Sequence, residues 1–102
     1  MANPTETPQA SAPAESSVDF TTYILSIRET ALVLLGLAES EHVHTEHADL
    51  DEARLQIDLL SMLHSKTSGN LTDDEDRLLR TVLYEVRVAW VQRCEELRQA
   101  GA

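Results

Sequence analysis

Apolar residues recur at intervals of three and four along three segments of this chain, and an α-helix places residues at that spacing on one face. The first segment holds Phe20, Tyr23, Ile24, Ile27, Ala31, Leu34 and Leu35; the second holds Leu50, Ala53, Ile57, Leu60 and Leu63; the third holds Leu78, Leu79, Val82, Leu83, Val86, Ala89, Trp90 and Leu97. A chain of 102 residues has room for one domain. The sequence therefore predicts an all-α protein whose three-helix domain covers residues 18–100.

Polar residues mark the start of the first two helices. Asp19 is the predicted N-cap of a helix that runs from residue 20 to about residue 37. Either Asp49 or Asp51 caps the second helix, which is expected to end at about residue 67.

The third helix has the clearest start signal. Thr72 and Glu75 match the capping box, in which each side chain bonds to the backbone N–H of the other residue. The third helix is therefore expected to begin after Thr72 and to continue for about 26 residues, to near the C-terminus. Gly69 is expected to adopt a left-handed conformation in the turn before it.

The N-terminal segment differs from the rest of the chain. Residues 1–17 contain all three prolines, set among small and polar residues, and are predicted to form a disordered tail. The first basic residue is Arg28, so the segment resembles neither a signal peptide nor a transit peptide. The longest apolar run is far shorter than the ~20 residues of a membrane span. We therefore expect a cytoplasmic protein that does not enter a membrane.

The charge of the chain argues against two classes of partner. Eighteen acidic residues against eight Lys and Arg give a net charge of −10. Nucleic acids and anionic membrane surfaces attract basic proteins, because binding neutralises phosphate groups. Neither is expected as a partner.

Two features predict a homodimer. Residues 31–35 are apolar on every side of the first helix, which is hard to cover with two other helices alone. The third helix, at roughly 39 Å, is longer than the second, at roughly 25 Å, and its overhang is expected to carry Val86, Val88, Trp90 and Val91. The predicted interface residues are Leu83, Val86 and Trp90, in a parallel or an antiparallel pairing.

The loop between the first two helices holds the one metal-like pattern of the sequence. His42, His44 and His47 lie within six residues of one another, and imidazole nitrogens bind zinc and nickel. Their spacing matches no established site, so a solvated polar loop is the preferred interpretation and a metal site is the alternative. We expect no cofactor.

Several segments of the chain together resemble a known family. They are DFTTYILS (19–26), ALVLLG (31–36), ARLQIDLLSML (53–63), KTSGNLT (66–72), DE (74–75) and LYEVR (83–87). In this order and spacing they resemble domain of unknown function family 1844, over residues 18 to about 91. The resemblance implies a small bacterial protein and brings no activity or site residues with it. The histidine-containing segment 39–48 departs from the family pattern.

Three functional hypotheses follow. The preferred one is a non-enzymatic module that self-associates and can bind another protein. The second is a metal-binding accessory protein that uses His42, His44 and His47. The third and least favoured is an enzyme with a site assembled across a dimer from residues 84, 85 and 87.

Overall fold

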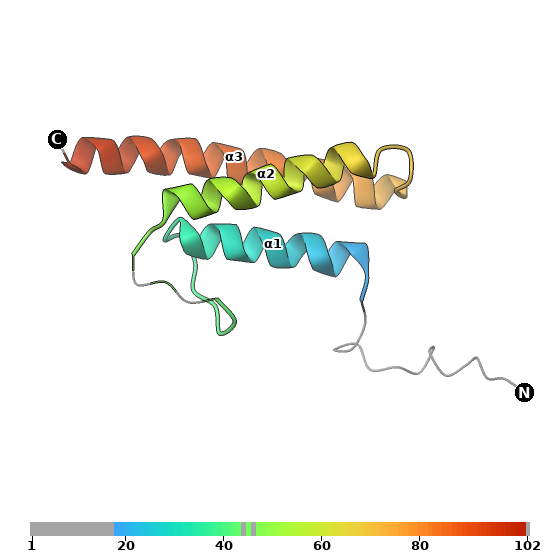
Figure 1. The fold of residues 1–102 in the computed structure, drawn as a ribbon, viewed down its shortest axis with the longest axis horizontal. Helices are drawn as coiled ribbons and strands as arrows, with labels where there is room; N and C mark the ends of the chain where they lie inside the picture. Colours follow the sequence, from blue (N-terminus) through green and yellow to red (C-terminus); the bar gives the residue numbers. More distant parts are fainter. Residues whose placement is uncertain (1–17, 44, 46, 102) are drawn as a thin grey trace, which may run out of the picture.

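The computed structural model describes residues 18–43, 45 and 47–101 and consists of three helices (Figure 1). These are α1 (Phe20–Leu34), α2 (Leu50–Lys66) and α3 (Asp73–Gly101). Each helix contacts the other two, so they form a three-helix bundle. The predicted all-α fold is confirmed for the part of the chain that the structure describes. The predicted disordered tail, residues 1–17, lies outside the described residues.

The helices alternate in direction along the bundle. In Figure 1, α1 and α3 run the same way and α2 returns between them. Their apolar stripes meet in one core, formed by Ile24, Ile27, Ala31, Ile57, Leu60, Leu79, Val82, Leu83 and Val86. Burying one such side chain fully contributes about 1.5–3 kcal/mol, so this shared core is the main source of stability. Within residues 18–43, 45 and 47–101, no helix combines the length and hydropathy of a membrane span.

The predicted N-caps form the expected hydrogen bonds. The Asp19 carboxylate accepts the backbone N–H of Thr22 at 2.7 Å, and that bond lowers the pKa of Asp19 below its ordinary value. Asp49 caps α2, which settles the choice that the sequence left open. Thr72 and Glu75 exchange the two bonds of the capping box, at 2.9 and 3.1 Å. The start of each helix is therefore fixed by a bond that the sequence predicts.

The end of α1 differs from the prediction. The helix ends at Leu34 rather than at about residue 37, because Gly36 adopts a φ of 78°. The Gly36 N–H bonds to the Val33 carbonyl, and the N–H of residue 37 bonds to the carbonyl of residue 32, both at 2.9 Å. This pair of bonds is the Schellman motif, which ends helices at a left-handed glycine. Gly69, with a φ of 81°, is left-handed as predicted.

Replacing Gly36 with alanine is expected to lower the free energy of unfolding by about 1–2 kcal/mol, since a side chain disfavours positive φ. A Cβ at this position would also lie 3.4 Å from the Arg93 guanidinium. Gly101→Ala is the control, because Gly101 lies in α3 with nothing within 4 Å of an added Cβ. Urea denaturation of both variants tests this; equal stability would contradict the assignment of Gly36 as the helix terminator.

The overhang of α3 carries other residues than predicted. α3 has 29 residues and α2 has 17, or about 43 Å against about 25 Å of helix. The Trp90 indole bonds to the carbonyl of Leu50, at the start of α2, and Arg93 bonds to the carbonyl of Leu35, at the end of α1. The start of α2 therefore lies beside Trp90 and the end of α1 beside Arg93. The C-terminal end of α3 projects past both shorter helices (Figure 1). Val86, expected on the overhang, is buried in the core.

Candidate functional site

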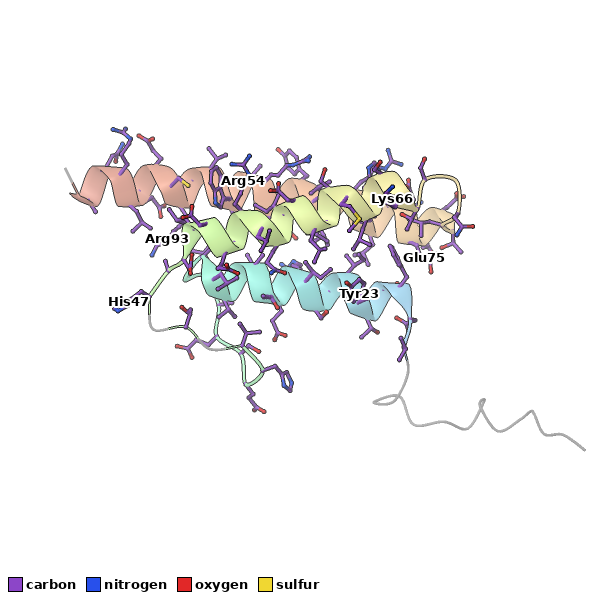
Figure 2. The ribbon with its side chains drawn as sticks, viewed as in Figure 1. Tyr23, His47, Arg54, Lys66, Glu75 and Arg93 are labelled. Carbon is purple, nitrogen blue, oxygen red and sulfur yellow. The ribbon has the colours of Figure 1, made fainter. Side chains whose placement is uncertain are left out.

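The histidine-containing loop lies at one end of the bundle, between α1 and α2. His47 is exposed, and its side chain points away from the helices (Figure 2). His42 is also exposed, with its backbone N–H bonded to Ser40 at 3.0 Å. His44 lies outside the described residues. Among the residues that the structure does describe, no group of three His, Cys, Asp or Glu side chains is placed to hold a metal ion, and the three-histidine site stays a prediction.

The same loop covers the end of α1. A pocket of about 440 Å³ lies between them, lined by Val33, Gly36, Ala38, Glu39, Ser40, Val43, Thr45, His47 and Ala48. Val33 lies outside the core cluster, yet it is only 4% exposed. Ala31 and Leu35 are buried as well, while Leu32 and Leu34 are half-buried. One chain thus covers three of these five residues, and the expectation that residues 31–35 need a second copy for cover is wrong for those three.

The predicted interface residues all serve the fold of a single chain. Leu83 and Val86 are core residues, 6% and 0% exposed. Trp90 is half-buried: its indole N–H donates to the Leu50 carbonyl at 2.9 Å, and the Arg54 guanidinium lies 5.2 Å from the ring centroid. These contacts satisfy the polar atom of the indole and cover one ring face with a cation. The apolar character of these three residues is explained without a partner.

Next to Trp90, Arg93 joins the ends of two helices. Its Nε donates to the Leu35 carbonyl at 2.9 Å, and its Nη1 lies 3.1 Å from Glu96. The C-terminal end of a helix leaves carbonyl groups unbonded and carries partial negative charge, so a guanidinium there is favourable. Arg93, in the C-terminal third of α3, lies near the end of α1 and the start of α2 (Figure 2). We call Trp90 and Arg93, with the groups they bind, the junction.

A second apolar stripe lies on the side of α3 that faces away from the core. Tyr84, Val88 and Val91 are spaced i, i+4, i+7, which places them on one helix face. They are 71%, 36% and 59% exposed. We call these three residues the outer face of α3. The sequence contains this second stripe, whereas the sequence-based prediction places Val88 and Val91 on an overhang.

The outer face of α2 is less continuous. Leu55 and Met62, seven residues apart, are 56% and 44% exposed. The residue that would complete this stripe, Leu59, packs against the core instead. Asp58 lies between them and pairs with Arg54 at 3.6 Å. Exposed apolar side chains thus form an unbroken series on α3 and an interrupted one on α2.

Charged residues flank the outer face of α3 on both ends. Towards its N-terminal end, Arg77 and Arg80 border a shallow pocket of about 360 Å³ that Thr81 and Tyr84 complete. Towards its C-terminal end lies Glu95, whose carboxylate accepts bonds from the side chains of residues 98 and 99. These bonds lower the pKa of Glu95 below its ordinary value. The stripe thus has apolar residues in the middle, Arg77 at one end and Glu95 at the other, and each of these two charges is paired with an opposite charge on α3.

The charged residues beside Tyr84 are held by other helices. The Glu85 carboxylate accepts a bond from Arg28 Nε at 2.8 Å, across the contact of α1 and α3. This bond raises the pKa of Arg28. Arg87 donates to the Ser61 hydroxyl at 3.3 Å, across the contact of α2 and α3. Glu85 and Arg87 therefore lie on opposite flanks of α3, each paired within one chain.

The comparisons with known proteins give one family. Searches of curated proteins and of solved structures each find no significant match. Residues 17–92 match the sequence model of a family, and that range includes all of α1 and α2 and most of α3. This confirms the resemblance seen in the sequence segments. The chain belongs to the family described as Domain of unknown function (DUF1844).

Proposed function

We propose that this protein is a non-enzymatic helical module that self-associates through the outer face of α3. The observation that carries the proposal is the second apolar stripe on that helix, opposite the side that forms the core. Three neighbouring side chains of this size, exposed on one rigid helix, are typical of an interaction surface. The surface projects away from α1 and α2, so a partner can approach it without displacing the bundle.

The other described surfaces support this choice. The polar pocket under the α1–α2 loop is open, and its lining includes exposed side chains such as His47. Glu85 and Arg87, which an enzyme hypothesis would use, are bound to Arg28 and Ser61. The outer face of α3 combines exposed apolar side chains with charged ends, which is the usual composition of a protein interface with a polar rim.

The size of the surface sets the expected affinity. The outer face and its charged ends run from residue 77 to residue 95, a length of roughly 27 Å at ~1.5 Å per residue. One helix face of this length is at the low end of stable interfaces, which bury ~800 Å² per partner. We therefore expect a dissociation constant of about 1–100 μM rather than nanomolar binding.

A matched pair of variants tests the proposal. Val91 on α3 and Leu55 on α2 are 59% and 56% exposed, so an aspartate costs the monomer about equally little at either position. In a dimer formed through the outer face of α3, Val91→Asp buries an unpaired charge and should weaken self-association by about 30-fold or more. Leu55→Asp should leave it within about threefold of wild type.

The readout is sedimentation equilibrium of both variants, with circular dichroism to show that each keeps its helices. The opposite result, in which Leu55→Asp dissociates the dimer and Val91→Asp does not, would move the interface to α2. A wild-type chain that stays monomeric but binds another helical protein through Val91 would make the surface a site for a different partner, contrary to the proposal.

A further inference from the structure

We propose that two copies of this chain pair their α3 helices antiparallel, with the two-fold axis passing between Tyr84 and Val88. This inference rests on the proposed self-association and adds its geometry. The spacing of the residues along α3 and their charges support it.

The stripe on the outer side of α3 is symmetric in its spacing. Extended in both directions, it consists of Arg77, Thr81, Tyr84, Val88, Val91 and Glu95. The intervals are four, three, four, three and four residues, so the series has the same spacing when followed from either end. Intervals that alternate between three and four are those of helices that pack along a common seam. An antiparallel pair centred on residue 86 therefore brings every position of the stripe opposite another position of the stripe.

The charges distinguish the two possible directions. In the antiparallel pair, Arg77 of each chain lies opposite Glu95 of the other, and Tyr84 lies opposite Val88. In a parallel pair in register, every residue meets its own copy, so Arg77 meets Arg77 and Glu95 meets Glu95. Like charges that face each other are unfavourable and opposite charges are favourable, which selects the antiparallel arrangement.

Arg77 and Glu95 can each form a further ion pair with the second copy. Arg77 lies 2.9 Å from Asp74 within its own chain, but these side chains are 71% and 91% exposed, and such a pair contributes little that would be lost. Glu95 accepts three bonds from the side chains of residues 98 and 99, and a carboxylate has about four acceptor positions, so its two oxygens can accept a fourth donor. The antiparallel dimer thus gains two reciprocal ion pairs without breaking a buried contact.

Charge reversal at the two positions tests this geometry in the full chain. Arg77→Glu alone and Glu95→Arg alone each place two pairs of like charges in the antiparallel dimer, and each should raise the dissociation constant by about tenfold at low salt. The double variant Arg77→Glu/Glu95→Arg restores opposite charges and should return to within about threefold of wild type. At about 0.5 M NaCl the differences should shrink, because the Debye length falls to a few ångströms.

The possible results separate this inference from the proposed function. Single variants that dimerise as wild type does, while Val91→Asp still dissociates the dimer, would retain the α3 interface and exclude the antiparallel pairing. A double variant as weak as either single variant would also exclude it, because its charges are then not opposed. A wild-type chain that does not dimerise at any concentration tested would overturn both proposals.

Discussion

Replacing Trp90 with alanine should lower the free energy of unfolding of the monomer by about 2–4 kcal/mol. Three effects contribute: the half-buried ring leaves a void against the core, the Leu50 carbonyl loses the indole N–H, and Arg54 loses its aromatic partner. The measurement is urea denaturation at a protein concentration well below the dissociation constant of the dimer, so that monomer stability alone is observed.

Trp90→Phe is the control for the separate contributions. Phenylalanine keeps most of the apolar contact and an aromatic face for Arg54, but has no N–H to donate, so a loss of about 1 kcal/mol is expected. The sequence alone favoured another role for Trp90, in the dimer interface. Trp90→Ala could instead leave the monomer as stable as wild type and only weaken self-association. In that case Trp90 would belong to the dimer interface, and the junction would not stabilise the monomer.

Arg93→Ala should have the second-largest effect on the fold, a loss of about 1.5–3 kcal/mol, because it removes a charged donor from the carbonyl at the end of α1. The Arg93 side chain is only 27% exposed, so water replaces its hydrogen bond poorly. Arg93→Lys keeps a positive charge near the helix end and should recover part of the stability.

Arg98→Ala is the matched control for Arg93→Ala. Arg98 lies five residues further along α3 and pairs only with Glu95 among the described residues, where it is 68% exposed. A pair this exposed contributes at most about 1 kcal/mol. Equal losses for the two alanine variants in urea denaturation would show that Arg93 acts as an ordinary surface charge and that the junction does not join α1 to α3.

The sequence predicts the helices well because their signals are local. The stripes of Ile24, Ile57 and Leu79, the cap at Asp19 and the capping box at Thr72 each depend on residues within one or two helical turns. The signal for the misplaced end of α1 is also local: Gly36 follows the last helical turn as a terminating glycine does, and the apolar run around it obscures that signal.

Contacts between helices cannot be predicted from these local signals. The pairing of Arg28 with Glu85 and the bond from Arg93 to Leu35 join residues more than fifty positions apart, and nothing in the spacing of either segment indicates them. The relative shift of α3 against α1 and α2 decides which residues overhang. That shift is set by core packing, which the sequence does not show. The sequence therefore predicts Trp90 and Val86 in an interface, whereas in the structure they contact other residues of the same chain.

The apolar stripe on the outer face of α3 is visible in the sequence, but it was not predicted to be a separate surface. Tyr84, Val88 and Val91 have the periodicity of a buried stripe, and so do Leu79, Val82, Leu83 and Val86 on the other side. A helix that is apolar on two sides predicts two contacts, one within the chain and one outside it. The expectation of a homodimer therefore stays a prediction, now based on different residues.

The most direct test of self-association is sedimentation equilibrium of the full chain at pH 7, over protein concentrations from about 1 to 500 μM, which bracket the expected dissociation constant. We expect an apparent mass that rises from 11.4 kDa towards twice that value as the concentration increases. We also expect Val91→Asp to stay at the lower mass over the same range while its helical circular dichroism is unchanged. A wild-type mass that remains at 11.4 kDa at every concentration would show that the chain does not self-associate through the outer face of α3.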